Sequence, residues 1–192
     1  MAERDTIQTE LNTYADLART FAADESVADK VARAADLSAE SLRSGGKLLA
    51  VGNGGSCADA VHFCEELTGR YRDDRAPIAA LACADAGHIT CTANDYGFEH
   101  VFARWVEALA RPGDVLVALS TSGNSANVIR AVKAARARKA HVLCLLGKGG
   151  GQLAGTADIE WVAPGETADR IQELHMLVLH TLVGAIERAL TR

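Results

Sequence analysis

The sequence predicts an α/β fold, a three-layer, doubly wound sheet of five parallel strands with two helices before it. Short apolar segments that suit buried strands alternate with longer segments in which apolar residues recur at helical spacing. Polar, glycine-containing loops follow two of the apolar segments and lead into helices. The length of 192 residues suits one hydrophobic core. We therefore expect a single domain that spans residues 1–192.

The first 45 residues predict two helices. Ile7, Leu11 and Tyr14 recur at helical spacing, a second set of apolar residues follows the same pattern after them, and Gly45 and Gly46 end the second helix. We expect this segment, residues 1–45, to serve oligomerisation. Residues 46–192 then form the α/β core.

Strands and helices alternate through the core. Short apolar runs predict strands at 47–51, 78–82, 115–119, 141–146 and 159–162. The run 115–119 is apolar throughout, as in a parallel strand that is covered on both faces. Helical spacing predicts helices at 57–71, at 101–110, from the loop at 120–125 as far as residue 138, and at 168–189. A polar loop is expected through 94–97.

Composition excludes several classes of protein. Hydrophobic residues make up 48% of the chain and charged residues 23%, as in compact globular proteins. The amino-terminal sequence MAERDTIQTE is too polar for a signal peptide, and no apolar run approaches the roughly 20 residues that cross a bilayer. The net charge is −5 and the basic residues are dispersed, which argues against nucleic acid as a partner. We expect a cytoplasmic protein that binds a small molecule and no membrane.

Two loops stand where ligands bind in open α/β sheets, beyond the carboxyl ends of strands. They are GNGGS at 52–56 and STSGNS at 120–125, and each opens a helix, whose free N–H groups favour an anion. A single N-cap would explain one serine or threonine. The surplus of hydroxyl groups at 120–125 favours a phosphate site instead. Neither loop has the pattern GxxxxGK[ST] or GxGxxG, which argues against a nucleotide.

A second group of polar residues lies on two predicted helices. His62 and Glu66 are four residues apart and project from one helical face, a spacing that suits ligands or acid–base groups but is also common at surfaces. Gln172 and His180 lie in an otherwise apolar segment of the last helix. These groups could bind a divalent ion such as zinc, or transfer protons without a metal. The sequence alone does not show that the two helices meet.

The remaining histidines and the cysteines have no comparable polar neighbours in the sequence. We interpret His88, His100, His141 and His175 as surface or hydrogen-bonded core residues. The five cysteines are an odd number with no CxxC pair and lie among apolar residues, so we expect free thiols.

The chain resembles the sugar isomerase (SIS) domain proteins, and among them the bacterial phosphoheptose isomerases, also called sedoheptulose 7-phosphate isomerases. The loops GNGGS and STSGNS are typical of SIS domains in general, and HFCEELTGRY at 62–71 and RIQE at 170–173 are more specific. ANDYGFE at 93–99 also carries the resemblance, which runs nearly from end to end. The residues at 57–58 and the short loop at 164–167 depart from the pattern. The resemblance implies the flavodoxin-like form of the fold.

The resemblance also implies the site residues. The implied metal is zinc, one ion per subunit, with the ligands His62, Glu66, Gln172 and His180. Glu66 and His180 are the implied catalytic residues. The implied substrate pocket contains Asn53, Gly54, Gly55, Ser56, Glu66, Arg70, Asn94, Asp95, Ser120, Thr121, Ser122, Ser125, Asp169 and Gln172.

The implied reaction converts sedoheptulose 7-phosphate into D-glycero-D-manno-heptose 7-phosphate, the first step of activated-heptose biosynthesis. Two alternatives stay open, a non-catalytic SIS protein that binds a sugar phosphate as an adaptor or regulator, and an isomerase of a shorter phosphosugar. The apolar faces of the N-terminal and last helices exceed what one sheet layer needs for its cover. We therefore expect a homo-oligomer, and the resemblance implies a tetramer.

Overall fold

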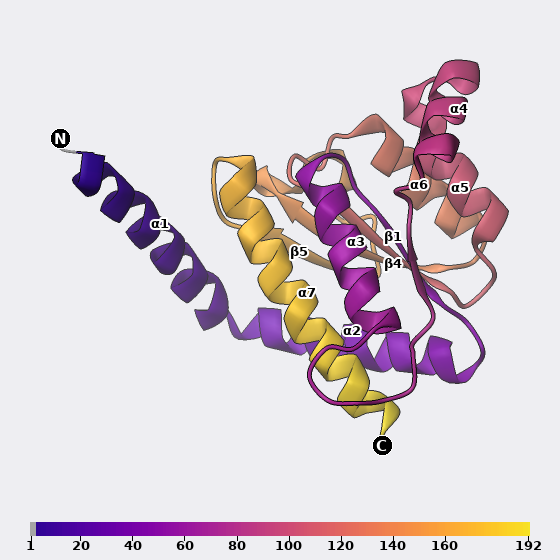
Figure 1. The fold of residues 1–192 in the computed structure, drawn as a ribbon, viewed down its shortest axis with the longest axis horizontal. Coiled ribbons are helices and arrows are strands. Elements are labelled where there is room, and N and C mark those ends of the chain that lie inside the picture. The colour runs from indigo at the N-terminus through magenta and orange to yellow at the C-terminus, as the bar shows by residue number, and fades with distance from the viewer. Residues whose placement is uncertain (1–2) are drawn as a thin grey trace.

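The structure, a computed structural model, describes residues 3–192 and contains one five-stranded parallel sheet (Figure 1). The strand order is β2-β1-β3-β4-β5, the flavodoxin-like order. This confirms the predicted fold class. The strands are β1 (Leu48–Val51), β2 (Ala80–Ala82), β3 (Val115–Ser120), β4 (His141–Gly147) and β5 (Ile159–Ala163).

Helices cover both faces of the sheet, as the alternating strand side chains require. The helices are α1 (Glu3–Ala23), α2 (Glu25–Arg43), α3 (Gly55–Thr68), α4 (Ala86–Tyr96), α5 (Val101–Leu109), α6 (Ala126–Ala137) and α7 (Ala168–Leu190). Leu48, Val117 and Leu145 point into one core with α2, α3 and α7, and Leu49 and Leu116 point into the other with α5 and α6. Both cores consist mainly of aliphatic residues that are almost fully buried.

Three local predictions differ from the structure. Residues 94–96 of the expected polar loop form the last turn of α4, a helix that begins after Asp85, whose carboxylate accepts the backbone N–H of His88. The helix expected to reach Tyr71 ends at Thr68, because Gly69 adopts a non-helical conformation. Short 3-10 helices η1 (Phe98–His100) and η2 (Lys148–Leu153) fill segments for which no element was predicted.

The topology brings the two glycine-containing loops to one edge of the sheet. Strands β1 and β3 are neighbours, and Val51 pairs with Ala118 at their carboxyl ends. The loop at 52–56 leads from β1 into α3, and the loop at 120–125 leads from β3 into α6. This is the position between β1 and β3 at which ligands bind in sheets of this order.

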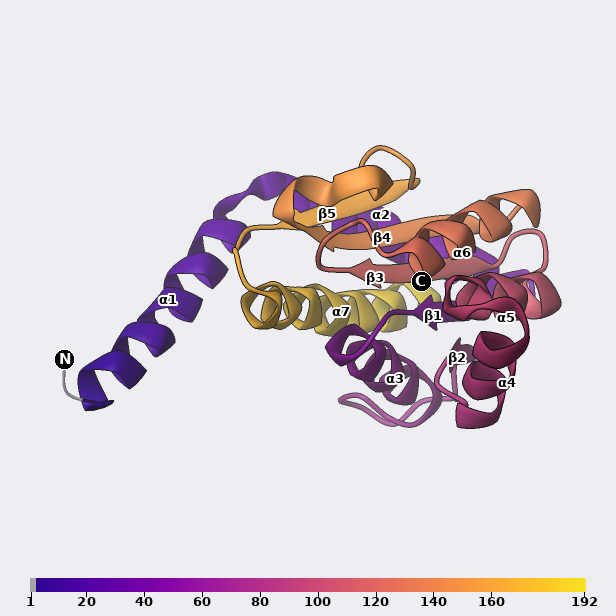
Figure 2. The same cartoon turned by 90° about the horizontal axis from the view of Figure 1, so that it is seen from above.

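The N-terminal helices differ in how they contact the core. Helix α2 packs on α7 and β5, where the indole Nε1 of Trp161 donates to the carbonyl oxygen of Val27 at 3.4 Å. Helix α1 projects away from the body of the molecule (Figures 1 and 2). Within residues 3–192, each helix is too short or too polar to cross a bilayer.

Candidate active site

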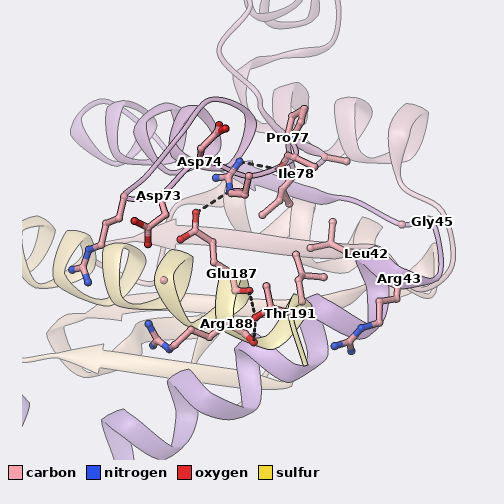
Figure 3. A pocket seen from close by; sticks show the side chains of 17 residues that line it. Leu42, Arg43, Gly45, Asp73, Asp74, Pro77, Ile78, Glu187, Arg188 and Thr191 are labelled. Carbon is pink, nitrogen blue, oxygen red and sulfur yellow. Dashed lines mark hydrogen bonds and ion pairs between the residues drawn. The ribbon is translucent and has the colours of Figure 1, made fainter.

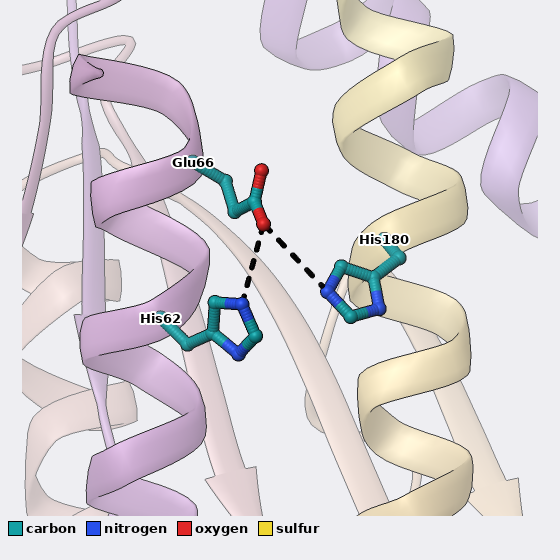
Figure 4. Close-up of side chains that lie close together, drawn as sticks. All are labelled: His62, Glu66 and His180. Atoms are coloured by element: carbon teal, nitrogen blue, oxygen red, sulfur yellow. Dashed lines mark hydrogen bonds and ion pairs between the residues drawn. The ribbon is translucent and has the colours of Figure 1, made fainter. Parts of the chain in front are cut away.

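Glu66 lies between two imidazoles that come from different helices (Figure 4). Its Oε1 is 3.2 Å from Nε2 of His62, one turn earlier on α3, and 3.9 Å from Nε2 of His180 on α7. The two histidine rings meet edge to face with their centroids 5.0 Å apart. Helices α3 and α7 pack side by side, so residues far apart in the sequence form one cluster.

The cluster is accessible from solvent and partly shielded by its neighbours. The side chain of Glu66 is 14% exposed, whereas those of His62 and His180 are 46% and 38% exposed. The ring of Tyr71 stacks on His180, with an interplanar angle of 13°. The cluster therefore has a partly buried carboxylate at its centre and open imidazole edges, an arrangement that a substrate or an ion can reach.

Asp59 is a further acidic group beside this cluster. It lies on α3 one turn before His62, and its Oδ2 is buried without a hydrogen-bond partner. Burial raises the pKa of this carboxyl to about 6, and the nearby His62 opposes the shift. Asp59 was not predicted from the sequence as a site residue. Its spacing of three residues from His62, on the same helical face, was the signal for it.

Gln172 lies in the same cavity as His180 but reaches toward the first loop. A cavity of about 530 Å³ is lined by Tyr14, Asp59, Asp169, Gln172, Glu173, Met176, Leu177 and His180. The amide of Gln172 lies over Gly55, where a Cβ atom would be 2.6 Å from both its oxygen and its nitrogen. The absence of a side chain at Gly55 thus makes room for this amide.

Hydrogen bonds among its own groups fix the shape of the second loop. The hydroxyls of Ser120 and Ser125 lie 3.2 Å apart, and the backbone N–H of Gly123 donates to Ser120 Oγ at 3.1 Å. Ser125 is the N-cap residue of α6, yet its side chain makes no capping hydrogen bond. Capping therefore does not account for the hydroxyl groups of the loop.

An amide pair fixes the first loop beside the second. Asn53 and Asn127 donate to each other's carbonyl oxygens at 2.9 and 2.8 Å. Asn127 is buried in the first turn of α6, directly after the second loop. Asn53 was predicted from the sequence as a site residue, whereas Asn127 was not. The pair connects the two loops across the gap between β1 and β3.

The structure places the other predicted site residues on several elements. Asn94 and Asp95 belong to the last turn of α4, which both views place away from α7, and the Asn94 amide donates to Asp95 at 2.7 Å (Figures 1 and 2). Arg70 is exposed just beyond α3. Asp169 lines the 530 Å³ cavity at the start of α7. Ser56 is buried in the first turn of α3.

The residues interpreted as structural lie outside the cluster. The Nε2 atom of His175 is 3.0 Å from the carbonyl oxygen of Leu146, and burial lowers the pKa of this histidine to about 4. All five cysteines are free thiols. Burial raises the pKa of Cys64, Cys83 and Cys144 to about 12, which makes these thiols poor nucleophiles.

Comparison with known proteins places this arrangement in a family. Residues 13–147 match the SIS domain family. A phosphoheptose isomerase of Yersinia pestis is 51% identical over 189 residues, which cover 98% of each chain. The chain belongs to the phosphoheptose isomerase family. A family member from Neisseria gonorrhoeae superposes with a TM-score of 0.89 at 40% identity, covering 96% of this chain and 98% of that one.

A second solved phosphoheptose isomerase, from Francisella tularensis, superposes with a TM-score of 0.93 at 33% identity over 98% of this chain and all of that chain. The similarity to phosphoheptose isomerases therefore covers α7 as well as the SIS match at 13–147. Both helices of the Glu66 cluster lie inside the region shared with these relatives.

Proposed function

We propose that this chain interconverts sedoheptulose 7-phosphate and D-glycero-D-manno-heptose 7-phosphate, with Glu66 and His180 as the groups that transfer protons. The observation that carries the proposal is the approach of Glu66 Oε1 to His180 Nε2, 3.9 Å apart across α3 and α7. A carboxylate and an imidazole at this separation can act on adjacent atoms of one substrate. Membership of the phosphoheptose isomerase family supports this choice of reaction.

The interconversion moves a proton between neighbouring carbons. One group removes a proton from C1 while another protonates the oxygen on C2, which gives an enediol. A proton is then returned to C2, and the hydroxyl on C1 loses its proton to become the aldehyde. Each step needs one base and one acid within hydrogen-bond reach, and Glu66 and His180 supply both kinds of group.

The residues of the cluster suit a zinc ion. Ligand atoms of His62, Glu66 and His180 all lie within 4.8 Å of one another, and imidazole nitrogen and carboxylate oxygen are usual zinc ligands. These three residues, with Gln172 as the predicted fourth, would hold the ion. When bound, zinc would polarise the oxygens on C1 and C2 of the sugar.

The substrate phosphate is proposed to lie in the loop at 120–125. The loop follows a fully buried strand, opens α6 and carries hydroxyls that capping does not explain. Asn53, Gly54, Gly55 and Ser56 would border the sugar from the first loop. Gln172 and Asp169 would border it from α7, with Arg70, Asn94 and Asp95 as further members of the proposed pocket.

Assembly and location complete the proposal. Ile7, Leu11 and Tyr14 on the projecting helix α1 are 50%, 60% and 37% exposed, an apolar stripe that a second copy could cover. We propose a homo-oligomer, a tetramer as the resemblance implies. A cytoplasmic location is part of the proposal, because a charged sugar phosphate does not cross a bilayer unaided.

The test is an incubation of the purified chain with sedoheptulose 7-phosphate, with and without added zinc, in which aldose formation is followed. The proposal predicts formation of the seven-carbon aldose phosphate. Turnover of a five- or six-carbon phosphosugar in place of the heptose would favour the shorter-substrate alternative. Binding of sugar phosphates without any turnover would favour the non-catalytic alternative.

A further inference from the structure

Arg75 lies in the segment between α3 and β2, and its side chain makes several hydrogen bonds to the end of α3 and to α7. Its side chain is only 18% exposed. The guanidinium Nη1 donates to the carbonyl oxygens of Leu67, Gly69 and Ala76 at 2.7, 3.1 and 3.3 Å. A cation that is mostly withdrawn from water needs partners that compensate its desolvation.

One of its bonds reaches Glu66 itself. Arg75 Nη2 donates to the backbone carbonyl oxygen of Glu66 at 2.6 Å. The last four carbonyls of a helix have no partner within the helix, and Glu66 and Leu67 belong to that group in α3. Arg75 therefore fixes the backbone of the residue whose carboxylate stands at the centre of the candidate site.

The same guanidinium also holds the opposite helix. Arg75 Nε donates to Glu187 Oε1 at 2.8 Å, and the Glu187 side chain is 17% exposed. Glu187 lies on α7 about two turns beyond His180. Figure 3 shows Glu187 extending from α7 into the cavity between that helix and the segment at 73–78. Arg75 thus connects the helix that carries Glu66 to the helix that carries His180.

We propose that Arg75 is a positioning residue, which fixes α3 against α7 and thereby sets the separation between Glu66 and His180. The proposal rests on the proposed function, because it concerns the same pair of groups. Proton transfer is sensitive to position, and a displacement of about 1 Å can lower a rate about 100-fold. Lysine cannot replace Arg75, because an ammonium group lacks the planar fork that reaches Glu187 and the α3 carbonyls together.

The test compares Arg75→Lys and Glu187→Ala with a matched control, Arg136→Gln. Arg136 also joins a carboxylate and a carbonyl, those of Asp158 and Thr156, but it connects α6 to the segment around β5. For each full-length variant, kcat and KM for sedoheptulose 7-phosphate, zinc affinity by competition with a chromophoric chelator, and Tm are measured. Zinc affinity reports the spacing of His62, Glu66 and His180 without any turnover.

We expect Arg75→Lys to lower kcat at least about 10-fold and zinc affinity about 10-fold, with KM changed less than about 3-fold. Glu187→Ala should also lower kcat and zinc affinity. This variant keeps the hydrogen bonds from Arg75 to the α3 carbonyls but removes the connection to α7. Arg136→Gln should lower Tm while kcat and zinc affinity stay at the wild-type values.

The proposal would be overturned if Arg75→Lys and Glu187→Ala both kept the wild-type kcat and zinc affinity. It would also be overturned if Arg136→Gln lost as much kcat and zinc affinity as these two variants. If Arg75→Lys does not fold, Glu187→Ala decides alone. If the wild-type chain binds zinc but does not turn over the heptose, the proposed function fails and the zinc affinities still decide this proposal. A wild-type chain that binds no zinc and has no turnover overturns both.

Discussion

His175 shows how burial fixes the protonation state of a single residue. It lies on α7 with 1% of its surface exposed, bonds to Leu146 through Nε2 and leaves Nδ1 without a partner. Desolvation disfavours the charged imidazolium and lowers the pKa of the residue to about 4. The native protein therefore holds this imidazole neutral across the physiological pH range.

The lowered pKa of His175 predicts a loss of stability on acidification. Between pH 6.5 and 4 the unfolded chain binds a proton at this residue and the native protein does not, so the free energy of unfolding falls as the pH falls. At pH 5 the loss is about 2 kcal/mol. Urea denaturation of the wild type and His175→Gln at pH 7.5 and pH 5 measures it. The free energy of unfolding of the wild type should exceed that of His175→Gln by less at pH 5 than at pH 7.5. An equal difference at both pH values would contradict the lowered pKa of His175.

A side chain at Gly55 is expected to disturb the candidate site and leave the fold intact. A Cβ atom in Gly55→Ala would displace the flexible amide of Gln172, so the variant should keep its Tm while kcat/KM falls about 10-fold. Gly87→Ala, which also lies in the first turn of a helix, is the control and should keep the wild-type Tm and kcat/KM. Steady-state kinetics and thermal unfolding of the two variants measure these effects. Normal kcat/KM in Gly55→Ala would show that the position of Gln172 does not matter.

At the scale of elements, the loop at 120–125 is predicted to hold the phosphate. Ser120→Ala with Ser122→Ala removes two hydroxyl donors, and hydrogen bonds to a charged group contribute about 1.5–3 kcal/mol each. Affinity for the phosphorylated sugar should fall at least about 10-fold, and affinity for the unphosphorylated analogue should change little. Calorimetric titration with both ligands measures the difference. Equal losses for both ligands would place the phosphate elsewhere.

The elements were predictable where burial is regular. Strands β3 and β4 are buried along almost their whole length, so their continuous apolar runs identified them. Helix α4 was missed because only Thr92 of its residues is buried, which leaves no apolar periodicity to read. Its β-branched Ile89, Thr90 and Thr92 also have low helix propensity. Contacts with α5 and η1, which the sequence does not show, stabilise it as a helix.

At the scale of the whole molecule, helix α1 predicts self-association. Its exposed Ile7 and Leu11 lie one turn apart on a helix that projects from the body, so a second copy should cover them. Light scattering at micromolar concentration should give a multiple of the chain mass, and Leu11→Glu should shift the protein toward smaller species. A stable wild-type monomer would contradict the proposed oligomer.

The candidate site was predictable only in part from the residues themselves. The spacing of His62 and Glu66 on one helical face was visible in the sequence, and so were both loops. The meeting of Glu66 with His180 was not, because it depends on the packing of α3 against α7. The family resemblance supplied that pair. Asp59 was missed although it shares a helical face with His62, because that spacing is also common at surfaces. Asn127 was missed because a lone amide carries no signal until its burial is known.

Steady-state turnover of sedoheptulose 7-phosphate by Glu66→Gln, His180→Gln and the double variant tests the central claim most directly. Glutamine keeps hydrogen-bonding capacity but cannot act as a base at Glu66 or as an acid–base group at His180. Each single variant should lower kcat at least about 100-fold with Tm nearly unchanged. The double variant should be little worse than the poorer single one, because the two groups act as a unit. Near-normal kcat in either single variant would contradict the assignment of Glu66 and His180 as the catalytic pair.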